Sequence, residues 1–297
     1  MSRWLITGSY GQLGTDLQGV LAVAPDEVVR AVDLDVLDIT DPPAVGAAVD
    51  DFNPDVLINA AAYTAVDAAE ENEELAFRVN STGPAVLAEA MARQGGRLIH
   101  VSTDYVFAGD AVRPYEVHDT PDPRSAYGRT KLAGELAVRE LMPDSSYVVR
   151  TAWVYGATGA NFVKTMARLE RERDTVSVVD DQRGSPTWSA DLARALVELA
   201  RSNATPGIYH CTGSGDTTWY GFTRAIFEEL GADPARVLAT TTDAVPRPAP
   251  RPAYSVLSDA AWRQAGLTPM PAWRDALRAA FAESGDAFRD RADGEGT

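Results

Sequence analysis

The sequence contains very little cysteine and histidine. Cys211 is the only cysteine among 297 residues, which excludes an intramolecular disulfide and any multi-cysteine metal site. The three histidines, His100, His118 and His210, are too few and too widely spaced to predict a histidine-rich metal centre. Composition therefore argues against a multi-cysteine or histidine-rich metal centre.

Long apolar runs and an excess of basic residues are also missing. No stretch approaches the roughly 20 apolar residues of a membrane span, and the opening residues MSRWLITGSYG do not resemble a signal peptide. The formal net charge of −16 argues against binding to nucleic acid or to an anionic membrane, because both need basic surface. We therefore predict a cytoplasmic protein whose partner is a small molecule.

The order of apolar runs predicts the fold. Short runs that are apolar throughout alternate with longer stretches of helical periodicity, which is typical of a parallel sheet covered on both faces. The strands are expected at 4–7, 28–32, 56–59, 98–102 and 148–151. The helices between and after them are expected at about 12–22, 43–52, 72–94, 126–142 and 160–172. The class is therefore α/β, with a Rossmann-type doubly wound parallel sheet.

After about residue 155 this rhythm changes, and glycine and proline become frequent. Further helices are expected at 189–201, 219–230, 258–265 and 271–283. We predict a dinucleotide-binding domain over 1–155, with a strand or helix returned to it from 175–205, and a smaller, irregular, mainly substrate-binding cap over 156–283. The polar, glycine-rich residues 284–297 are expected to be disordered.

Three glycines directly follow the first expected strand. Gly8, Gly11 and Gly14 precede apolar residues at helical spacing, so the loop leads into a helix. Glycines let a diphosphate approach the backbone, and the free N–H groups of the helix start favour an anion. The spacing G-x-x-G-x-x-G differs from the commoner G-x-G-x-x-G, so a plain tight turn remains the alternative.

Asp33 ends the second apolar run, 19 residues after Gly14. A carboxylate at this place suits the ribose hydroxyls of an adenosine and repels a 2′-phosphate, which favours NADH over NADPH. The alternative is an ordinary turn aspartate, because Asp35 and Asp38 lie close by.

Tyr127 and Lys131 are four residues apart in the helix expected at 126–142 and therefore lie on one face. A lysine ammonium can stabilise a phenolate and lower the pKa of the tyrosine, which suits proton transfer. The pattern alone is equally consistent with a surface helix. Thr103 and Asp104 favour the chemical reading, because they end the fourth strand at the edge where such sheets bind ligands. Small residues such as Ala60 end the third strand and leave room for a cofactor.

Together the glycine loop and the segments NAAA, STDYVF and YGRTK resemble the extended short-chain dehydrogenase/reductase family over at least residues 3–156. The resemblance implies that Tyr127 is the proton donor, that Lys131 tunes the tyrosine and binds ribose, and that Thr103 donates a hydrogen bond to the carbonyl. Segments such as STDYVFAGD, DDQRGSPTW and GIYHCTGSGDTTWYGF resemble the dTDP-4-dehydrorhamnose reductase branch of that family, up to about residue 283.

That narrower resemblance implies reduction by NADH or NADPH of the C4 ketone of a dTDP-4-dehydro-6-deoxy-L-hexose, giving dTDP-L-rhamnose. The implied cofactor residues are Gly8, Gly11, Gln12, Leu13, Gly14, Asp33, Asp38, Ile39, Ala60, Ala62, Tyr63, Thr64, Tyr127 and Lys131. The implied substrate residues are Thr103, Asp104, Trp153 and Arg251. Trp153 could instead be a core tryptophan, and Arg251 a solvated loop arginine.

Some members of this branch dimerise through a magnesium ion held by glutamates. The corresponding positions are Asp16 and Ala190, so we expect no metal and a monomer or weak homodimer. Two alternative functions remain open at this point. One is a 4-ketoreductase of a specialised dTDP-deoxysugar, for example of the streptose type, in antibiotic biosynthesis. The other is a non-catalytic regulatory subunit with the same fold.

Overall fold

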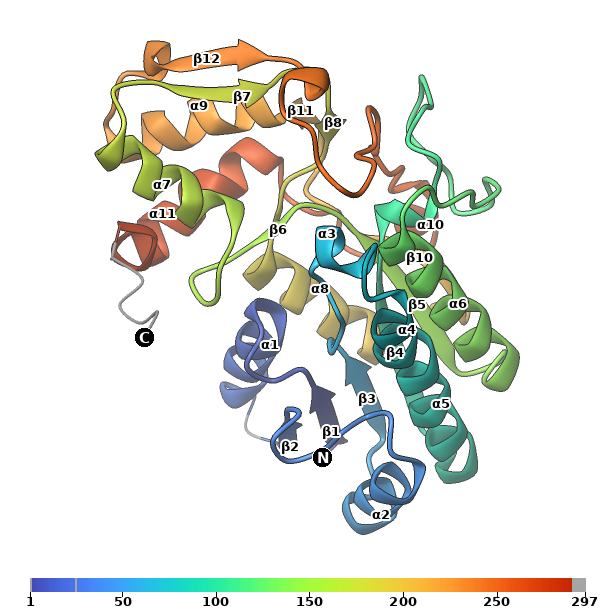
Figure 1. Ribbon diagram of the computed structural model, residues 1–297. Helices are drawn as coiled ribbons and strands as arrows, with labels where there is room; N and C mark the ends of the chain where they lie inside the picture. Colours follow the sequence, from blue (N-terminus) through green and yellow to red (C-terminus); the bar gives the residue numbers. More distant parts are fainter. Residues whose placement is uncertain (1, 25, 290–297) are drawn as a thin grey trace.

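The computed structural model describes residues 2–24 and 26–289. Its centre is a parallel sheet in the order β10-β5-β4-β3-β1-β2 (Figure 1). The strands are β1 (Ser2–Thr7), β2 (Glu27–Val32), β3 (Val56–Asn59), β4 (Arg97–Thr103), β5 (Ser146–Thr151) and β10 (Gly207–His210). The five strands predicted from apolar runs are thus present. The sixth, β10, returns from the second half of the chain, just beyond the range 175–205.

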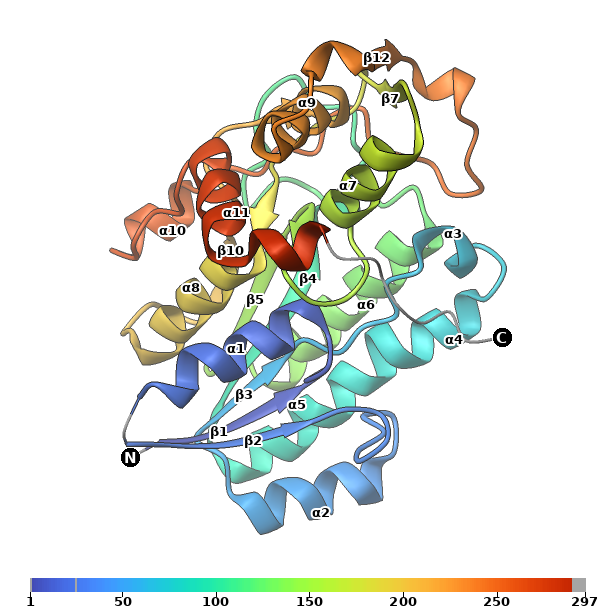
Figure 2. The ribbon, with the colours of Figure 1, turned by 90° about the vertical axis from the view of Figure 1, so that its left-hand side faces the viewer.

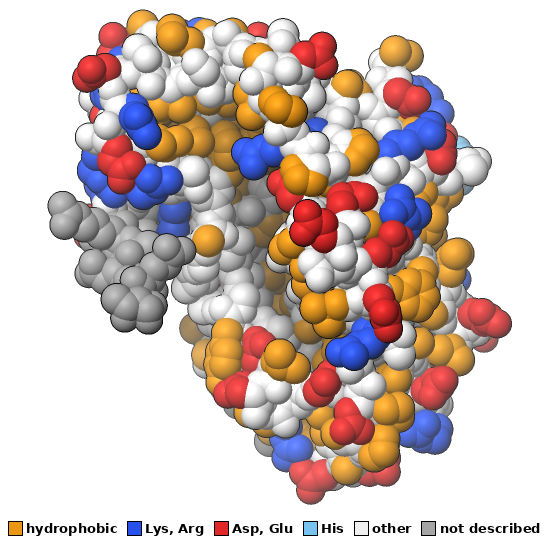
Figure 3. All heavy atoms as spheres, in the orientation of Figure 1, with side chains coloured by type: hydrophobic (Ala, Val, Ile, Leu, Met, Phe, Trp, Pro, Cys, Tyr) orange, Lys and Arg blue, Asp and Glu red, His pale blue; other side chains and the backbone are white. Residues whose placement is uncertain are grey.

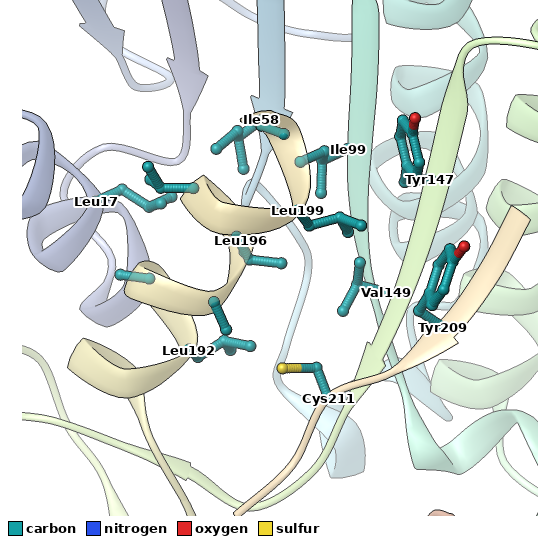
Figure 4. Close-up of a cluster of buried hydrophobic side chains, with 14 of the residues drawn as sticks. Leu17, Ile58, Ile99, Tyr147, Val149, Leu192, Leu196, Leu199, Tyr209 and Cys211 are labelled. Carbon is teal, nitrogen blue, oxygen red and sulfur yellow. The ribbon is translucent and has the colours of Figure 1, made fainter. Parts of the chain in front are cut away.

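Helices cover both faces of this sheet (Figure 2). One face carries α1 (Gln12–Ala22) and α8 (Ser189–Arg201), and the other carries α2 (Pro42–Phe52), α5 (Gly83–Gln94) and α6 (Ala126–Leu141). Figure 4 shows the core under α8, whose leucines point toward strand residues. Those leucines are Leu192, Leu196 and Leu199, and the strand residues include Ile58 and Ile99. The predicted doubly wound Rossmann-type fold is confirmed.

Helix α6 is held close to its neighbours by a cap and two glycines. Ser125 precedes the helix, and its side chain accepts a hydrogen bond from the Gly128 N–H at 3.1 Å. A Cβ on Gly128 would lie 2.2 Å from the Tyr105 carbonyl oxygen, and one on Gly134 would lie 2.1 Å from that of Asn80. Only glycine therefore permits this approach, which brings the buried start of α6 to the carboxyl end of β4.

The long helix expected at 72–94 is present without a gap, but its hydrogen-bonding pattern changes part-way along. It consists of α4 (Glu73–Phe77), a π-helical turn η1 (Arg78–Thr82) and α5. Pro84 explains the change, because it has no N–H to donate to the carbonyl of Asn80 four residues earlier. Apolar periodicity could not reveal this turn, which turns Asn80 toward the loop after β3.

The second half of the chain forms a smaller body above the sheet edge (Figure 1). Its helices are α7 (Phe162–Glu172), α9 (Trp219–Leu230) and α11 (Trp273–Arg289). In contrast, α8, β10 and α10 (Ala260–Gln264) belong to the sheet half, where Trp262 of α10 packs against Tyr209 of β10. The short strands of the smaller body pair as β6 (Val154–Tyr155) with β9 (Thr187–Trp188), β7 (Val176–Val179) with β12 (Val237–Thr240), and β8 (Arg183–Gly184) with β11 (Thr217–Thr218). The remaining short helices are α3 (Val66–Ala69), η2 (Asp104–Val106), η3 (Pro234–Arg236) and η4 (Thr242–Ala244).

Helix α11 continues past residue 283, where we expected a disordered tail to begin. It kinks at Ser284 and runs on to Arg289. The extension is anchored by Phe288, which is 1% exposed and packs on Phe281 with ring centroids 5.0 Å apart. Residues 290–297 of the expected tail lie outside the described residues. Within the described ranges, no helix has the length and apolar character needed to cross a membrane.

Candidate functional site

A cleft of about 900 Å³ lies between the carboxyl edge of the sheet and the smaller body. Figure 3 shows the molecule hollowed between these two parts. Of the residues predicted to bind cofactor or substrate or to act in catalysis, all but Arg251 line this cleft. They are Gly8, Gly11, Gln12, Leu13, Gly14, Asp33, Asp38, Ile39, Ala60, Ala62, Tyr63, Thr64, Thr103, Asp104, Tyr127, Lys131 and Trp153.

The glycine loop joins β1 to α1 at one end of the cleft. Gly8 has φ +75°, and a Cβ there would lie 2.6 Å from the backbone nitrogen of Ala61. A Cβ on Gly14 would lie 2.1 Å from the carbonyl oxygen of Gly8. Gly11 immediately precedes α1, so the free N–H groups of the helix start face the cleft end. The loop is therefore packed as tightly as a diphosphate cradle requires.

The carboxylate of Asp33 lies at the end of β2 beside this loop. Its oxygens accept hydrogen bonds from the backbone N–H groups of Tyr10 at 2.8 Å and Leu34 at 2.9 Å. Asp38 accepts the backbone N–H of Thr40 at 2.8 Å, and this bond holds the pKa of its carboxyl below the usual value. The turn that carries both aspartates is thus fixed by its own hydrogen bonds.

Two further cofactor candidates are held by contacts across the cleft floor. Ile39 is 6% exposed, and a Cβ on Gly83 would lie 2.6 Å from its Cδ1 atom. Tyr63 is braced by Asn80, whose Oδ1 accepts the Tyr63 N–H at 2.8 Å and whose Nδ2 donates to the Tyr63 carbonyl at 3.1 Å. The unexpected π-helical turn therefore has a direct effect at the site, because it positions Asn80.

Thr103, Asp104 and Tyr127 meet at the carboxyl end of β4. The hydroxyl of Thr103 donates to Oδ1 of Asp104 at 3.0 Å and accepts the N–H of Tyr105 at 3.2 Å. The rings of Tyr105 and Tyr127 pack edge to face, with centroids 5.5 Å apart. Burial raises the pKa of Asp104 to about 6, although the hydroxyls of Ser255 and Thr103 act in the opposite direction.

The expectation that Lys131 lowers the pKa of Tyr127 is wrong for this structure. Burial raises the pKa of Tyr127 to about 12, against a partial lowering by a hydrogen bond with Thr103. The amine of Lys131 donates instead to the Val101 carbonyl at 2.7 Å. A phenol with a raised pKa is protonated at neutral pH, so Tyr127 remains in the state that a proton donor needs.

Trp153, which the resemblance implied to contact the substrate, packs against a second indole. Its indole stacks on that of Trp219, with ring centroids 3.5 Å apart and planes at 8°. A Cβ on Gly184 would lie 2.5 Å from the same indole. At least part of the Trp153 ring is therefore already covered, and Trp219 shares its place in the cleft wall. Its backbone has φ +50°, a left-handed conformation that is rare for tryptophan.

Arg251 lies beside the cleft and not in its lining. Its Nη2 atom forms an ion pair with Oδ2 of Asp67 at 2.8 Å, and Arg247 approaches the same oxygen at 3.8 Å. Asp67 belongs to α3, whose neighbouring residue Val66 does line the cleft. The ion pair thus joins the smaller body to the half of the molecule that carries the sheet, at the cleft edge.

The positions compared with a magnesium site lie elsewhere. Asp16 accepts a hydrogen bond from the hydroxyl of Ser189, and burial raises the pKa of its carboxyl. Ala190 offers no ligand. Within 2–24 and 26–289, no group of three or more His, Cys, Asp or Glu side chains lies close enough to hold a metal ion. The absence of a metal stays a prediction.

Sequence reasoning missed several residues of the cleft wall. Most of them lie one or two residues from a predicted site residue, so their strand or loop position was the available signal: Val66, Val101, Ser102, Tyr105, Thr151, Ala152 and Val154. Val79 comes from the π-helical turn η1. Others come from the smaller body, namely Gly159, Ala160, Phe162 and Trp219. The helices expected at 160–172 and 219–230 begin near these four residues, but the spacing of apolar residues does not indicate that the four face the sheet edge.

With this geometry in place, comparison with known proteins is informative. The family described as "RmlD substrate binding domain" matches residues 2–285. A "dTDP-4-dehydrorhamnose reductase" of Streptomyces griseus is 50% identical over 283 residues, which cover 94% of this chain and 93% of that relative. The chain belongs to the dTDP-4-dehydrorhamnose reductase family. The prediction of an oxidoreductase is therefore confirmed at the level of the family.

Two further relatives show the breadth of this family. A "probable dTDP-4,6-dihydroxy-2-methyloxan-3-one 4-ketoreductase" of Streptomyces antibioticus is 49% identical over 283 residues, which cover 95% of each chain. The crystal structure of a Bacillus anthracis dTDP-4-dehydrorhamnose reductase in complex with NADP superposes with a TM-score of 0.91. Its sequence is 39% identical, and the match covers 95% of this chain and 99% of that one.

Proposed function

We propose that this protein reduces the C4 ketone of a dTDP-4-dehydro-6-deoxy-L-hexose with NADH or NADPH, giving dTDP-L-rhamnose. The observation that carries the proposal is the gathering of Thr103, Tyr127 and Lys131 in the wall of the same cleft that ends at the glycine loop. The names of the relatives favour the same substrate class.

A dinucleotide fits the residues at the loop. The contacts that a Cβ would make at Gly8 and Gly14 leave no side chain between the backbone and a diphosphate. Gly11, Gln12 and Leu13 would hold the diphosphate, Asp33, Asp38 and Ile39 the adenosine, and Ala60, Ala62, Tyr63 and Thr64 the nicotinamide side. When bound, the reduced nicotinamide supplies a hydride to the ketone carbon.

Asp33 favours NADH in this proposal. Its carboxylate would face the ribose hydroxyls, where a 2′-phosphate would meet a like charge. Arg30 on β2, the basic residue nearest to Asp33 in the sequence, is paired with Asp51 at 2.8 Å and lies over the ring of Phe52. A comparison of KM for NADH and NADPH tests this preference, and a lower KM for NADPH would contradict it.

The residues of the chain would complete the reaction. Tyr127 would give its phenolic proton to the ketone oxygen, and Thr103 would donate a hydrogen bond to the same oxygen after turning from Asp104. Asp104, Trp153 and Arg251 would contact the nucleotide sugar. The test is consumption of NADH with the ketosugar made in situ by the upstream dehydratase and epimerase. The proposal fails if the purified chain consumes no cofactor under these conditions.

A second candidate is a 4-ketoreductase of a specialised dTDP-deoxysugar, for example of the streptose type. It is favoured by the Streptomyces antibioticus relative, whose name gives a different ketosugar at almost the same identity as the rhamnose enzyme. NMR of the product distinguishes the two candidates, because the configuration and branching of the sugar differ.

A further inference from the structure

Four buried polar side chains form a chain across the sheet beneath the cleft, and the proposed reaction makes no use of its middle members. The hydroxyl of Thr7 on β1 lies 2.7 Å from Oδ1 of Asn59 on β3. Nδ2 of Asn59 lies 3.1 Å from Nδ1 of His100 on β4, and Nε2 of His100 lies 3.5 Å from Nζ of Lys131 on α6. Asn59 is 1% exposed and His100 is fully buried.

The direction of this chain is set at Asn59. Its Oδ1 atom accepts the backbone N–H of Ala61 at 3.1 Å, so the amide group has its oxygen on that side. Nδ2 therefore faces Nδ1 of His100, and an amide nitrogen only donates. Burial, with a smaller effect of Lys131, holds the pKa of His100 well below its usual value, so the ring is neutral. Its single proton must then lie on Nε2.

The N–H of His100 consequently points at Nζ of Lys131. An amine nitrogen has a lone pair that can accept this hydrogen, whereas an ammonium has only donors. The same Nζ donates to the Val101 carbonyl at 2.7 Å. Every member of the chain is satisfied when Lys131 is an amine, and two donors oppose each other when it is an ammonium.

The other charged and titratable groups near Lys131 do not by themselves determine whether it is an amine or an ammonium. The titratable groups beside Lys131 are His100 from β4, and Tyr127 and Glu135, which lie four residues before and after it on the same face of α6. Glu135 favours the ammonium, but its carboxylate is paired with Arg150 of β5 at 2.7 Å. Burial is the largest influence and lowers the pKa of Lys131 to about 8. The lysine is therefore close to the point at which one hydrogen bond decides its state.

We propose that His100 is a positioning residue that links the protonation of Lys131 to the filling of the cleft. Its Nε2–H favours the amine form of Lys131, held against Val101. A ligand that offers hydroxyl oxygens as acceptors draws Lys131 into the ammonium form, with one proton taken from solvent. The ligand class is the ribose of a nicotinamide dinucleotide, so this last step rests on the proposed function.

The protein is well suited to a direct test of this proposal, because Lys131 and Lys164 are its only lysines. Protein labelled with ¹³C-lysine gives two Cε signals, and the second one is an internal reference. We expect the Lys131 signal to titrate with a midpoint near pH 8 in the unliganded wild type. Asn59→Asp keeps the shape of the side chain but reverses the direction of the hydrogen bonds through His100. A carboxylate accepts a hydrogen bond from Nδ1–H of His100, which leaves Nε2 as an acceptor. We expect the substitution to raise the midpoint by about one unit.

A charge at position 59 could act on Lys131 without passing through His100. The control is the same substitution in a His100→Phe background, where the ring is kept and both nitrogens are removed. We expect the shift caused by Asn59→Asp to fall to less than half. His100→Leu serves the same purpose if the Phe variant does not fold. An unchanged midpoint in Asn59→Asp, or an equal shift in both backgrounds, overturns the proposal.

Adding NADH separates this inference from the proposed function. We expect calorimetry in two buffers of different ionisation enthalpy at pH 8 to record uptake of about half a proton by the wild type, and less by Asn59→Asp. NADH that does not bind contradicts the proposed function, while the titration of the free protein still decides the role of His100. NADH that binds with equal proton uptake in both proteins contradicts the role of His100.

Discussion

Asp104 is hydrogen-bonded through Oδ1 to its neighbour Thr103, while its buried Oδ2 atom has no hydrogen bond of normal geometry among the described residues, although the hydroxyl of Ser255 lies near enough to lower the pKa of the carboxyl. The side chain is 3% exposed. A half-satisfied carboxylate in such a place is costly to ionise, and burial accordingly raises its pKa to about 6. The residue is therefore suited to binding a hydroxyl group of a ligand, which could satisfy the second oxygen.

This burial predicts an effect of Asp104→Asn on stability. The folded protein holds the carboxyl proton up to about pH 6, and the unfolded chain loses it near pH 3.8. The stability contribution of the neutral form is complete below pH 3.8 and is lost as pH rises through 6. An amide has no such cost. At pH 8 the variant should therefore gain up to about 3 kcal/mol over the wild type, and about half as much at pH 5.

Urea unfolding at pH 5 and pH 8 measures this difference. Asp50→Asn is the matched control, since Asp50 is exposed and its substitution should change little at either pH. A variant that is less stable than the wild type at pH 8, or a gain that is equal at both pH values, would show that ionisation of Asp104 does not limit stability.

Tyr127→Phe should lower kcat for the ketosugar by about 10²–10⁴-fold, because the variant has no proton to give to the ketone oxygen. Binding of NADH should change little, since the ring remains. The measurement is steady-state NADH consumption together with a binding titration. Tyr209→Phe is the control, because its hydroxyl bonds the Thr205 carbonyl at 2.6 Å, away from the cleft. A Tyr127→Phe rate within a few-fold of the wild type contradicts the proton-donor role.

Gly8→Ala should weaken NADH binding and lower stability together. The added Cβ would lie 2.6 Å from the Ala61 backbone in a left-handed conformation, so the loop and the end of β3 must move apart. The matched control is Gly19→Ala in helix α1, where a Cβ meets nothing within 4 Å. That variant should gain about 0.5–1 kcal/mol and bind NADH normally. Thermal unfolding measures the stability, and a fluorescence titration measures NADH binding. Normal NADH binding by Gly8→Ala would contradict the proposed role of the glycine loop in binding the diphosphate.

Much of this cleft could be predicted because parallel strands end at one edge. Gly8 and Asp33 directly follow strands and Thr103 ends one, so the fold alone brings them together. Helix periodicity then placed Tyr127 and Lys131 on one face. These inferences needed only strand order and residue spacing, which are local properties of the sequence.

The remainder depended on features that strand order and residue spacing do not register. The π-helical turn at Asn80 follows from one missing N–H at Pro84, which apolar periodicity does not register. The stacking of Trp219 on Trp153 joins two irregular regions of the smaller body. The pKa of Tyr127 was predicted with the wrong sign, because spacing shows a neighbouring cation but not how deeply the phenol is buried.

The ion pair of Arg251 with Asp67 allows a sharp test of the proposed substrate role of Arg251. If Arg251 binds the diphosphate of the nucleotide sugar, Arg251→Ala should raise KM for that substrate about tenfold or more and leave kcat nearly unchanged. Asp67 would then compete with the diphosphate for the same guanidinium, so Asp67→Asn should lower KM. Arg247→Ala is the control, because Arg247 is 59% exposed and 3.8 Å from Asp67.

Arg251→Ala and Asp67→Asn together distinguish ligand binding by Arg251 from a purely structural role of its ion pair with Asp67. If the ion pair only holds α3 against the smaller body, Arg251→Ala and Asp67→Asn remove it equally, because each removes one of its two charges. Both variants would then raise KM, or both would lower stability without a change in KM. Opposite effects on KM require that Arg251 has a second anionic partner, and steady-state kinetics over a range of nucleotide-sugar concentrations decides between these outcomes.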